Sequence, residues 1–452
     1  MAKFDLNDPG VVVIVGSGAG GGTLGNELAQ KGIKVVILEA GPRIENQDFI
    51  NDEWESFSQL AWSHARTTSG SWQVAKDFPS LPAWIVKAVG GSTTHWAGAK
   101  KLGCKEVHTG RMAYSEPRDG RGSCLQIGFC FQDCKSGAKE STLYTEIPKG
   151  EATGNLEVRP NSMVLKIEHD ASGKVSGVVY ADDNSVMQRQ KARVVAVAGN
   201  SIESPRLLLN RASSMFPDGL ANSSGQVGRN YMRHMTGSVY AVFEKSVHMY
   251  RGTTMAGIVR DEAINNPGRG FVGGYEMETL SLGVPFMAAF LKPGAWGREF
   301  TSAMESYPRM AGMWLVGEDM PQETNRVTLD PKVKDKFGLP VASVHFDDHP
   351  NDIAMRAHAY KQGAAVYEAV GATVTYPTPP YPSTHNLGTN RMCENPRDGV
   401  VNQFGQTHDI RNLFISDGSQ FTSGAACNPT LIVSLAIRQA DYMATAMQKK
   451  EI

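Results

Sequence analysis

The sequence predicts an α/β protein in which a Rossmann-type domain is joined to a second domain that is rich in strand-like segments. A glycine-rich turn follows a β-branched run near the N-terminus, and later segments alternate apolar and polar residues. The chain has 452 residues, which is more than one ordinary hydrophobic core accommodates. These three observations favour two domains over one.

The first expected unit is a strand, a helix and a second strand. Residues 11–15 form a short β-branched run, and residues 34–38 are a second apolar strand. Between them, residues 24–30 are typical of a helix, and Gly32 is a plausible stop signal. This arrangement predicts half of a βαβ unit.

Three glycines between the first strand and the helix follow the spacing Gly16-x-Gly18-x-x-Gly21. The first makes the turn, the second lets the backbone approach a pyrophosphate, and the third lets helix and strand pack closely. The N–H groups at the helix N-terminus would bind phosphates, and Glu39, 23 residues after Gly16, can accept hydrogen bonds from a ribose diol. The pattern predicts a dinucleotide cofactor, and it does not by itself separate NAD from FAD.

Further strands are expected in the middle of the chain. Residues 156–181 alternate apolar and polar side chains, which predicts antiparallel strands. Residues 194–198 form another buried strand, and a helix follows with Ser201 or Ser204 as its expected cap.

The C-terminal half divides into a second domain and a final helix. Residues 216–384 are rich in strand-like segments and turns, whereas residues 429–448 have the apolar spacing of an amphipathic helix that begins near Pro429. The expected division is a first dinucleotide-binding part over 1–100, a cysteine-rich segment over 101–145, a second dinucleotide-binding part over 146–215, a substrate-binding domain over 216–384 and a C-terminal part over 385–452.

Composition excludes several classes of function. Lys and Arg total 45 and Asp and Glu 46, so no strong basic field exists to hold nucleic acid or an anionic membrane. No apolar run approaches the ~20 residues of a membrane span, and the N-terminus does not have the pattern of a signal peptide. This favours the cytoplasm, unless a partner subunit carries an export signal. Six cysteines are too few for a disulfide framework.

Nine sequence blocks, in order, resemble the glucose–methanol–choline (GMC) oxidoreductase family. They are VIVGSGAGGG (13–22), LEAG (38–41), VGGSTTHWAG (89–98), VVAVAGNSIESPRLLL (194–209), VGRNYMRH (227–234), NRVTLD (325–330), HNLGTNRM (385–392), ISDGSQF (415–421) and CNPTLIVSLAIRQAD (427–441). The resemblance implies a FAD-binding domain assembled from several chain segments and a substrate domain on an antiparallel sheet. The segment that normally follows VGGSTTHWAG in the family is much shorter here.

The resemblance also implies the reacting residues. The family oxidises an alcohol by taking the hydroxyl proton and transferring hydride to flavin N5, and a histidine suits the proton transfer. His385 opens the HNLGT block and matches the catalytic histidine, with a structural core histidine as the alternative. Asn428 matches the partner position that holds the alkoxide, and it could also act as a helix N-cap.

The same resemblance places residues along the FAD. Asp417 matches a residue near the phosphate and ribityl chain, with a capping role as the alternative. His95 occupies a position at which some relatives attach FAD covalently, and non-covalent contact and a structural role remain open. The residues expected to line the cofactor are Gly16, Gly18, Gly21, Glu39, Gly90, Gly91, Ser92, His95, Val164, Ala198 and Asp417.

Cys124, Cys130 and Cys134 are spaced C-x5-C-x3-C in a Gly-rich, polar segment. Thiolates this close suit a metal or cluster, and zinc normally takes four ligands. The pattern resembles the flavoprotein subunits of bacterial glucose, gluconate and fructose dehydrogenases, which implies a 3Fe–4S cluster. A zinc site and free thiols are the alternatives. Cys393 and Cys427 are expected to be buried thiols.

Together these resemblances imply an FAD-dependent dehydrogenase of a sugar or sugar derivative, such as a pyranose or the 3-hydroxyl of a glucoside. Electrons would pass through the cluster to a cytochrome c partner. A small chaperone-like subunit would carry the export signal and place the enzyme in the periplasm. An oxygen-dependent alcohol or sugar oxidase is one alternative, and an inactive flavin-binding subunit is another.

Overall fold

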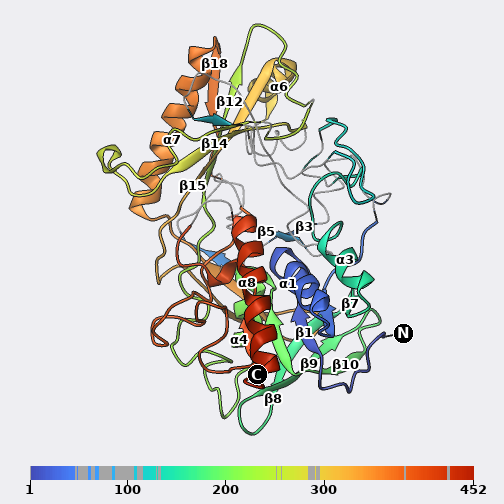
Figure 1. Cartoon of the computed structure of the whole chain (residues 1–452). Helices are drawn as coiled ribbons and strands as arrows, with labels where there is room; N and C mark the ends of the chain where they lie inside the picture. Colours follow the sequence, from blue (N-terminus) through green and yellow to red (C-terminus); the bar gives the residue numbers. More distant parts are fainter. Residues whose placement is uncertain are drawn as a thin grey trace.

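Two large sheets dominate the structure, which is a computed structural model, and they lie one above the other in Figure 1. The structure describes residues 2–45, 48, 60–62, 67–70, 84–86, 106–108, 116–128, 130, 134–250, 252–255, 257–283, 291, 296–380, 383–424 and 428–452.

The lower sheet is parallel, with strand order β19-β11-β1-β2-β7. Its strands are β1 (Val12–Val15), β2 (Val35–Leu38), β7 (Leu156–Arg159), β11 (Val194–Val197) and β19 (Leu413–Ile415). Most of these residues are β-branched or aliphatic and fully buried, as expected for a sheet covered on both faces. Strands from both halves of the chain therefore build one sheet, as expected for a domain assembled from separate segments.

Helices and a small sheet cover the two faces of the parallel sheet. Leu24 and Leu28 of α1 (Ala19–Gln30) and Ala440 of α8 (Asn428–Gln448) pack with Ile14 on one face. On the other face, β8 (Met163–His169), β9 (Val175–Ala181) and β10 (Met187–Lys191) form an antiparallel sheet that packs against the alternate side chains of the parallel strands. Two hydrophobic clusters therefore hold the domain together, one on each face.

The expectation of antiparallel strands over 156–181 is right for β8 and β9 and wrong for β7. β7 pairs with β2 in the parallel direction, from Val35 opposite Leu156 onward. Leu156 is buried in the cluster beneath α1, so the strand belongs to the edge of the parallel sheet. Alternation of apolar and polar residues shows that a strand has one buried face, and it does not give the direction of its neighbour.

The helix predictions are largely confirmed. α1 ends at Gln30, and Gly32 has a left-handed φ of 78° just beyond it. The expected serine cap of α4 (Asn200–Leu209) is wrong, because the N-cap is Gly199 and both serines lie inside the helix. The C-terminal helix α8 is present as expected.

The upper sheet is antiparallel, with strand order β18-β12-β15-β14-β13-β6. Its strands are β6 (Val107–His108), β12 (Met235–Val242), β13 (Ile258–Val259), β14 (Tyr275–Thr279), β15 (Met310–Gly317) and β18 (Val374–Pro377). Met355 and Ala359 of α7 (Pro350–Ala369) pack on one face against Met313 and Leu315. The antiparallel second sheet is thus confirmed, while the exact domain boundaries stay a prediction.

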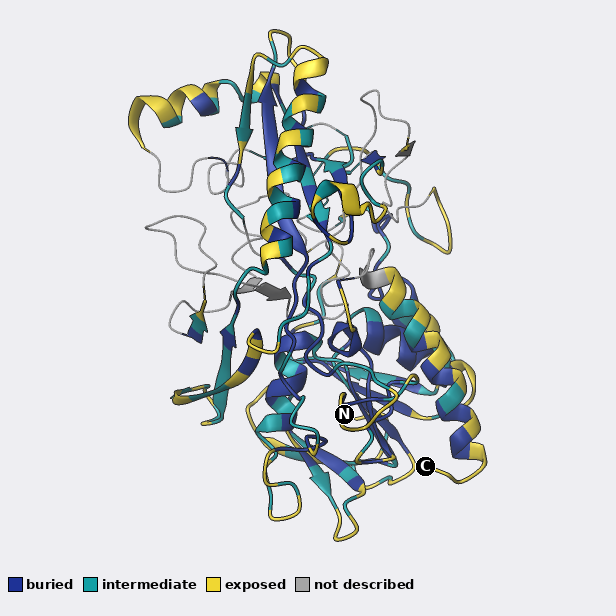
Figure 2. Ribbon diagram, turned by 90° about the vertical axis from the view of Figure 1, so that its left-hand side faces the viewer, coloured by how far each residue is buried: buried dark blue, intermediate teal, exposed yellow. Residues whose placement is uncertain are grey.

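Smaller elements connect and flank these layers. They are β3 (Leu60–Trp62), β4 (Thr68–Ser69), β5 (Trp84–Val86), α3 (Glu146–Ala152), η4 (Pro267–Arg269), α6 (Gly297–Glu305), η5 (Tyr307–Arg309), β16 (Arg326–Lys334), β17 (Pro340–His345) and η6 (Gly418–Gln420). Figure 2 shows the sheets buried and the outer faces of the long helices exposed. Among the described residues, no helix has both the length and the apolar character needed to cross a membrane.

Candidate active site

The glycine turn between β1 and α1 is pressed against neighbouring backbone. Gly16 has a φ of 96°, and a Cβ there would lie 2.5 Å from the carbonyl oxygen of Ala198. A Cβ on Gly21 would lie 2.1 Å from the carbonyl oxygen of Gly16. The N-cap of α1 is Gly18, which has no side chain to cap the helix, and the first turn contains no acidic residue. The helix N-terminus is thus suited to a pyrophosphate, and the turn fits FAD.

Glu39 links this turn to the end of β2. Its buried carboxylate accepts hydrogen bonds from the N–H of Ser17 at 3.0 Å, the Ser17 hydroxyl at 2.7 Å and the N–H of Gly41 at 3.0 Å. Burial raises the pKa of the Glu39 carboxyl, and the hydrogen bonds from Gly41 and Ser17 oppose that rise. Glu39 fixes the shape of the turn, while its contact with a ribose stays a prediction.

Asp417 follows β19 and caps two elements. Its Oδ2 accepts hydrogen bonds from the N–H of Asn200 at 2.9 Å and the hydroxyl of Ser204 at 2.5 Å, and its Oδ1 accepts from the N–H of Ser419 at 2.9 Å. Burial raises the pKa of Asp417, and the hydrogen bonds from Ser204 and Ser419 oppose the rise. The capping alternative is therefore observed, and a contact with FAD stays a prediction.

The remaining expected cofactor residues fall into two groups. Ala198 follows β11 and faces Gly16, and Val164 is buried in β8 opposite Tyr180. Their contact with FAD stays a prediction. Gly90, Gly91, Ser92 and His95 lie outside the described residues.

His385 is partly buried and pairs with a second histidine. The Nδ1 atoms of His385 and His234 are 2.9 Å apart, and the rings are nearly perpendicular at 86°. Burial, followed by the nearby charge of His234, lowers the pKa of His385 to about 3. The imidazole is therefore neutral near pH 7, and one of its nitrogens has a free lone pair that can accept a proton.

Two segments hold this histidine pair in place. Met232 and Leu387 exchange backbone hydrogen bonds of 3.1 and 2.9 Å, and the hydroxyl of Tyr231 donates to Oδ1 of Asn386 at 2.6 Å. A Cβ on Gly388 would lie 2.2 Å from the carbonyl oxygen of Asn230, so only glycine fits there. The 227–234 and 385–392 blocks, distant in sequence, therefore form one rigid unit.

A buried carboxylate stands behind the pair. Oδ2 of Asp319, two residues after β15, accepts the N–H of Arg233 at 2.7 Å, and the N–H of His234 also donates to this carboxylate. Burial raises the pKa of Asp319, and the charge of His234 is the largest effect that opposes the rise. His234 and Asp319 were not assigned from the sequence. The sequence offered one indication for His234, which is its place at the end of the VGRNYMRH block. It offered none for Asp319, which becomes a neighbour of His234 only when the antiparallel sheet forms.

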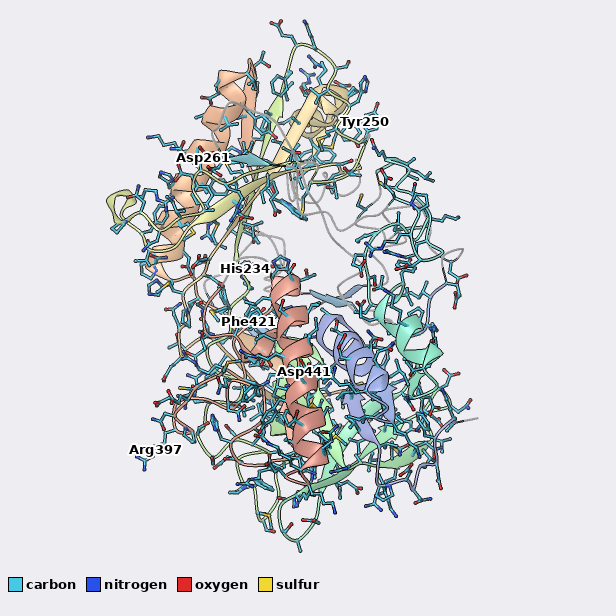
Figure 3. All side chains as sticks on the ribbon, in the orientation of Figure 1. His234, Tyr250, Asp261, Arg397, Phe421 and Asp441 are labelled. Carbon is cyan, nitrogen blue, oxygen red and sulfur yellow. The ribbon has the colours of Figure 1, made fainter. Side chains whose placement is uncertain are left out.

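Asn428 is the first residue of α8, and its side chain lies outside what the structure describes. Its pairing with His385 therefore stays a prediction. Gly424 packs closely against Asp319, because a Cβ on Gly424 would lie 2.5 Å from Oδ1 of Asp319. Figure 3 shows His234 between the two sheets, near the level of the N-terminal end of α8.

The three clustered cysteines are partly buried and are not joined by disulfides. Burial raises the pKa of the Cys130 thiol, and the charges of Cys124 and Cys134 add to the rise. However, the described residues contain no group of three or more His, Cys, Asp or Glu side chains placed to hold a metal ion. The geometry therefore does not support the expected 3Fe–4S ligand set.

The other cysteine expectations are only partly testable. Cys393 is partly exposed, so the expectation that it is buried is wrong. It lies beside Val400 and Val401 near the surface loop that follows residue 392, and its backbone is paired there. Cys427 lies outside the described residues.

Comparisons with known proteins place the chain in a family. Residues 45–236 match the N-terminal profile of GMC oxidoreductases and residues 321–436 match the C-terminal profile. A 2-methyl-1,2-propanediol dehydrogenase from Mycolicibacterium austroafricanum is 30% identical, with 96% of this chain and 94% of the relative covered. The fructose dehydrogenase large subunit of Gluconobacter japonicus is 25% identical, with 95% of this chain and 97% of that subunit covered. A gluconate 2-dehydrogenase flavoprotein from Pantoea cypripedii is 26% identical, with 69% of this chain and 54% of that flavoprotein covered.

The chain belongs to the GMC oxidoreductase family, whose members are flavin-dependent enzymes that act on the CH–OH groups of alcohols and sugars. The crystal structure of pyridoxine 4-oxidase from Mesorbium loti has the same fold, with a TM-score of 0.66, 13% identity, and 96% of this chain and 98% of that chain covered.

The first of these relatives also bears on the short segment after VGGSTTHWAG. Its alignment spans 526 positions, although this chain has only 452 residues. The relative therefore contains internal stretches that have no counterpart here.

Proposed function

We propose that the chain is an FAD-dependent dehydrogenase that oxidises a hydroxyl of a sugar or sugar derivative, such as a pyranose or the 3-hydroxyl of a glucoside. The observation that carries the proposal is His385, which is partly buried and neutral and lies in a block that joins the nucleotide-binding sheet to the antiparallel sheet. Two of the relatives are named as dehydrogenases of fructose and gluconate, which supports this substrate class.

Bound FAD supplies the hydride acceptor. The chain's own residues provide the turn around Gly16, Gly18 and Gly21 for the pyrophosphate, and His385 accepts the proton of the substrate hydroxyl. Burial favours the neutral base in the resting enzyme, so the lone pair is available without prior loss of a proton. Asn428 would donate a hydrogen bond to the substrate oxygen and hold it as the charge develops.

The proposal includes a 3Fe–4S cluster on Cys124, Cys130 and Cys134, a cytochrome c acceptor and a small chaperone-like subunit. The C-x5-C-x3-C spacing supports the cluster. The two relatives named as a large subunit and a flavoprotein support an assembly with other subunits. Export with such a partner would place the enzyme in the periplasm.

A short branched diol is a second candidate substrate. It is favoured by the 30% identity to a 2-methyl-1,2-propanediol dehydrogenase over nearly the full length of both chains. The reaction at the hydroxyl would be the same, and only the substrate domain would have to recognise a smaller molecule.

Anaerobic titration of the purified holoprotein tests these proposals. We expect an absorption spectrum of flavin and bleaching by at least one of a panel of aldoses, glucosides, fructose, gluconate and 2-methyl-1,2-propanediol. Bleaching by the diol alone would select the second candidate. Absence of bleaching by every compound would contradict the dehydrogenase, and peroxide release in air would indicate an oxidase. Flavin without iron and sulfide would contradict the cluster.

A further inference from the structure

We propose that His234 is a positioning residue that also receives a proton during the reaction. As His385 takes the hydroxyl proton on Nε2, it passes its Nδ1 proton to Nδ1 of His234. This inference rests on the proposed function, because it concerns the same proton transfer. It assigns a role to a residue that neither the sequence motifs nor the relatives' names indicate.

The geometry of the pair determines which atoms can react. With the two Nδ1 atoms 2.9 Å apart, one nitrogen must donate and the other accept. His385 can take a proton on Nε2 only if its Nδ1 already carries one, so Nδ1 of His234 must then be the acceptor. The hydrogen bond therefore selects the reactive tautomer of His385 and aims its Nε2 lone pair away from His234.

The surroundings favour a positive charge on His234 over one on His385. Loss of hydration and the nearby charge of His234 lower the pKa of His385 to about 3, so a proton kept on it would be costly. His234 interacts with the charge of Asp319, and Oδ1 of that buried carboxylate has no hydrogen-bond partner within the described residues. A proton transferred to His234 therefore lies next to a compensating negative charge.

The backbone holds His234 in this place at some cost. Its φ of 63° lies in the left-handed region, which residues other than glycine rarely adopt. The carboxylate of Asp319 accepts the N–H groups of Arg233 and His234 and thereby fixes this turn. The imidazole and the carboxylate are thus positioned by the same contacts.

Other charged groups near Asp319 are largely engaged with one another. Arg356 donates to Asp348 at 2.7 Å, Arg233 lies 3.9 Å from Asp348, and the Arg233 guanidinium also stacks over Phe346 at 4.6 Å. The titratable and charged groups around His234 and Asp319 are Arg233, Glu318, Asp348, Asp352, Arg356 and His385. Among these groups, the carboxylate of Asp319 interacts with the charge of His234.

The step balances in protons and electrons. The substrate O–H bond breaks and an Nε2–H bond forms on His385, while the Nδ1–H bond of His385 breaks and an Nδ1–H bond forms on His234. Bound flavin would supply the hydride acceptor, and the carbon that carried the hydroxyl becomes a carbonyl carbon. After the product leaves, the proton on Nδ1 of His234 returns to Nδ1 of His385 and the Nε2 proton of His385 leaves to solvent. The second proton, which left the substrate as hydride, would be released when the electrons pass to the acceptor.

The first test does not depend on catalysis. Protein labelled with 15N-histidine is titrated by NMR, and the His234 signals are identified by their absence in His234→Gln. We expect these signals to titrate between about pH 5 and 9, and Asp319→Asn to lower their midpoint by about one unit or more. The His234 inference is overturned if the signals do not titrate in the wild type. If Asp319→Asn does not fold, the wild-type titration still decides.

The second test measures anaerobic flavin reduction. We expect His234→Gln, which can still accept a hydrogen bond but cannot take a proton, to slow reduction by about 100-fold at neutral pH. The solvent deuterium effect should change from two protons in flight to one. His169→Gln, which loses the 3.1 Å contact with Ser213 at the far end of β8, is the matched control and should react like the wild type.

The outcomes separate the two hypotheses. A wild-type flavin that no hydroxyl compound bleaches contradicts the proposed function, while the NMR titration still tests His234. A wild-type flavin that is bleached, together with an equally fast His234→Gln variant and an unchanged two-proton effect, contradicts the proton transfer to His234 alone.

Discussion

At the scale of single residues, burial decides the protonation of the groups that would react. His385 is kept neutral by burial and by the charge of its neighbour His234, although its unperturbed pKa of 6.5 would leave it partly charged near neutral pH. Glu39, Asp319 and Asp417 have pKa values raised by burial, but each carboxylate accepts hydrogen bonds that favour its charged form.

Replacement of His385 by Asn tests its role as the base. The variant removes the proton acceptor and shortens the side chain, and we expect flavin reduction by an accepted substrate to slow by about 10²–10⁴-fold. Stopped-flow absorbance under anaerobic conditions measures this rate, with His169→Gln as the control. Flavin content should not change, since His385 is not part of the glycine turn. If the flavin of His385→Asn were reduced at the wild-type rate, another group would have to take the proton.

At the scale of secondary-structure elements, two helix N-termini differ in whether their first turn contains an acidic residue. The N-terminus of α1 has no acidic residue in its first turn, which leaves its N–H groups suited to a ligand. The first turn of α7 contains Asp352, which accepts the N–H of Met320 at 3.3 Å. Burial, followed by the charge of Asp319, raises the pKa of Asp352 to about 7.

Gly16→Ala tests the cofactor turn at α1. The new Cβ would lie 2.5 Å from the carbonyl oxygen of Ala198, and the φ of 96° strains any residue with a side chain. We expect the purified variant to contain less than about a tenth of the wild-type flavin and to unfold with a free energy about 2–4 kcal/mol lower.

Gly32→Ala is the matched control for Gly16→Ala. Gly32 also has a left-handed φ, of 78°, but a Cβ there meets no atom within 4 Å. It should therefore keep its flavin and lose only about 1 kcal/mol. If absorbance showed equal flavin in both variants, the turn would not be the pyrophosphate site.

Asp352→Asn tests the pH dependence of stability at α7. Because its pKa rises from 3.8 in the unfolded chain to about 7 in the folded protein, Asp352 contributes stability that is fully present below pH 3.8 and is lost as the pH rises through about 7. The Asn variant cannot ionise, so it should be more stable than the wild type at pH 8, by at most ~4 kcal/mol, with the gain shrinking toward pH 4. Denaturant unfolding at several pH values measures this difference.

Asp330→Asn provides the opposite case. Backbone hydrogen bonds from Val333 and Lys332 lower the pKa of this carboxyl. Since the folded pKa is depressed, the contribution of Asp330 to stability is present above the unfolded pKa and is lost as the pH falls through the folded pKa.

If Asp352→Asn changed the free energy of unfolding by the same amount at every pH, the Asp352 carboxyl would have the same pKa in the folded and unfolded chain.

At the scale of the whole molecule, β1, α1 and β2 could be predicted because local signals specify them. The valines of β1, the spacing of Gly16, Gly18 and Gly21, and Gly32 lie within one short stretch. The pairing of β7 with β2 could not be predicted, because alternation does not encode the neighbour of a strand. The pairing of His234 with Asp319 could not be predicted either, because 85 residues and several strands of the upper sheet separate them in the chain.

Cys130→Ser tests how electrons leave the molecule as a whole. If the three thiols hold a cluster, loss of one ligand should reduce iron and sulfide from about three per chain to below about one. Flavin should still be bleached by the substrate, because His385 and the glycine turn are unchanged. Turnover with cytochrome c should fall at least tenfold.

Cys393→Ser, outside the spaced triplet and partly exposed, is the control for Cys130→Ser and should retain iron and turnover. Iron analysis and anaerobic bleaching on the same samples separate the two functions of the chain. Full iron in Cys130→Ser would exclude the triplet as the ligand set. Iron-free wild type that still turns over with oxygen would mean that electrons leave directly from the flavin, as in an oxidase.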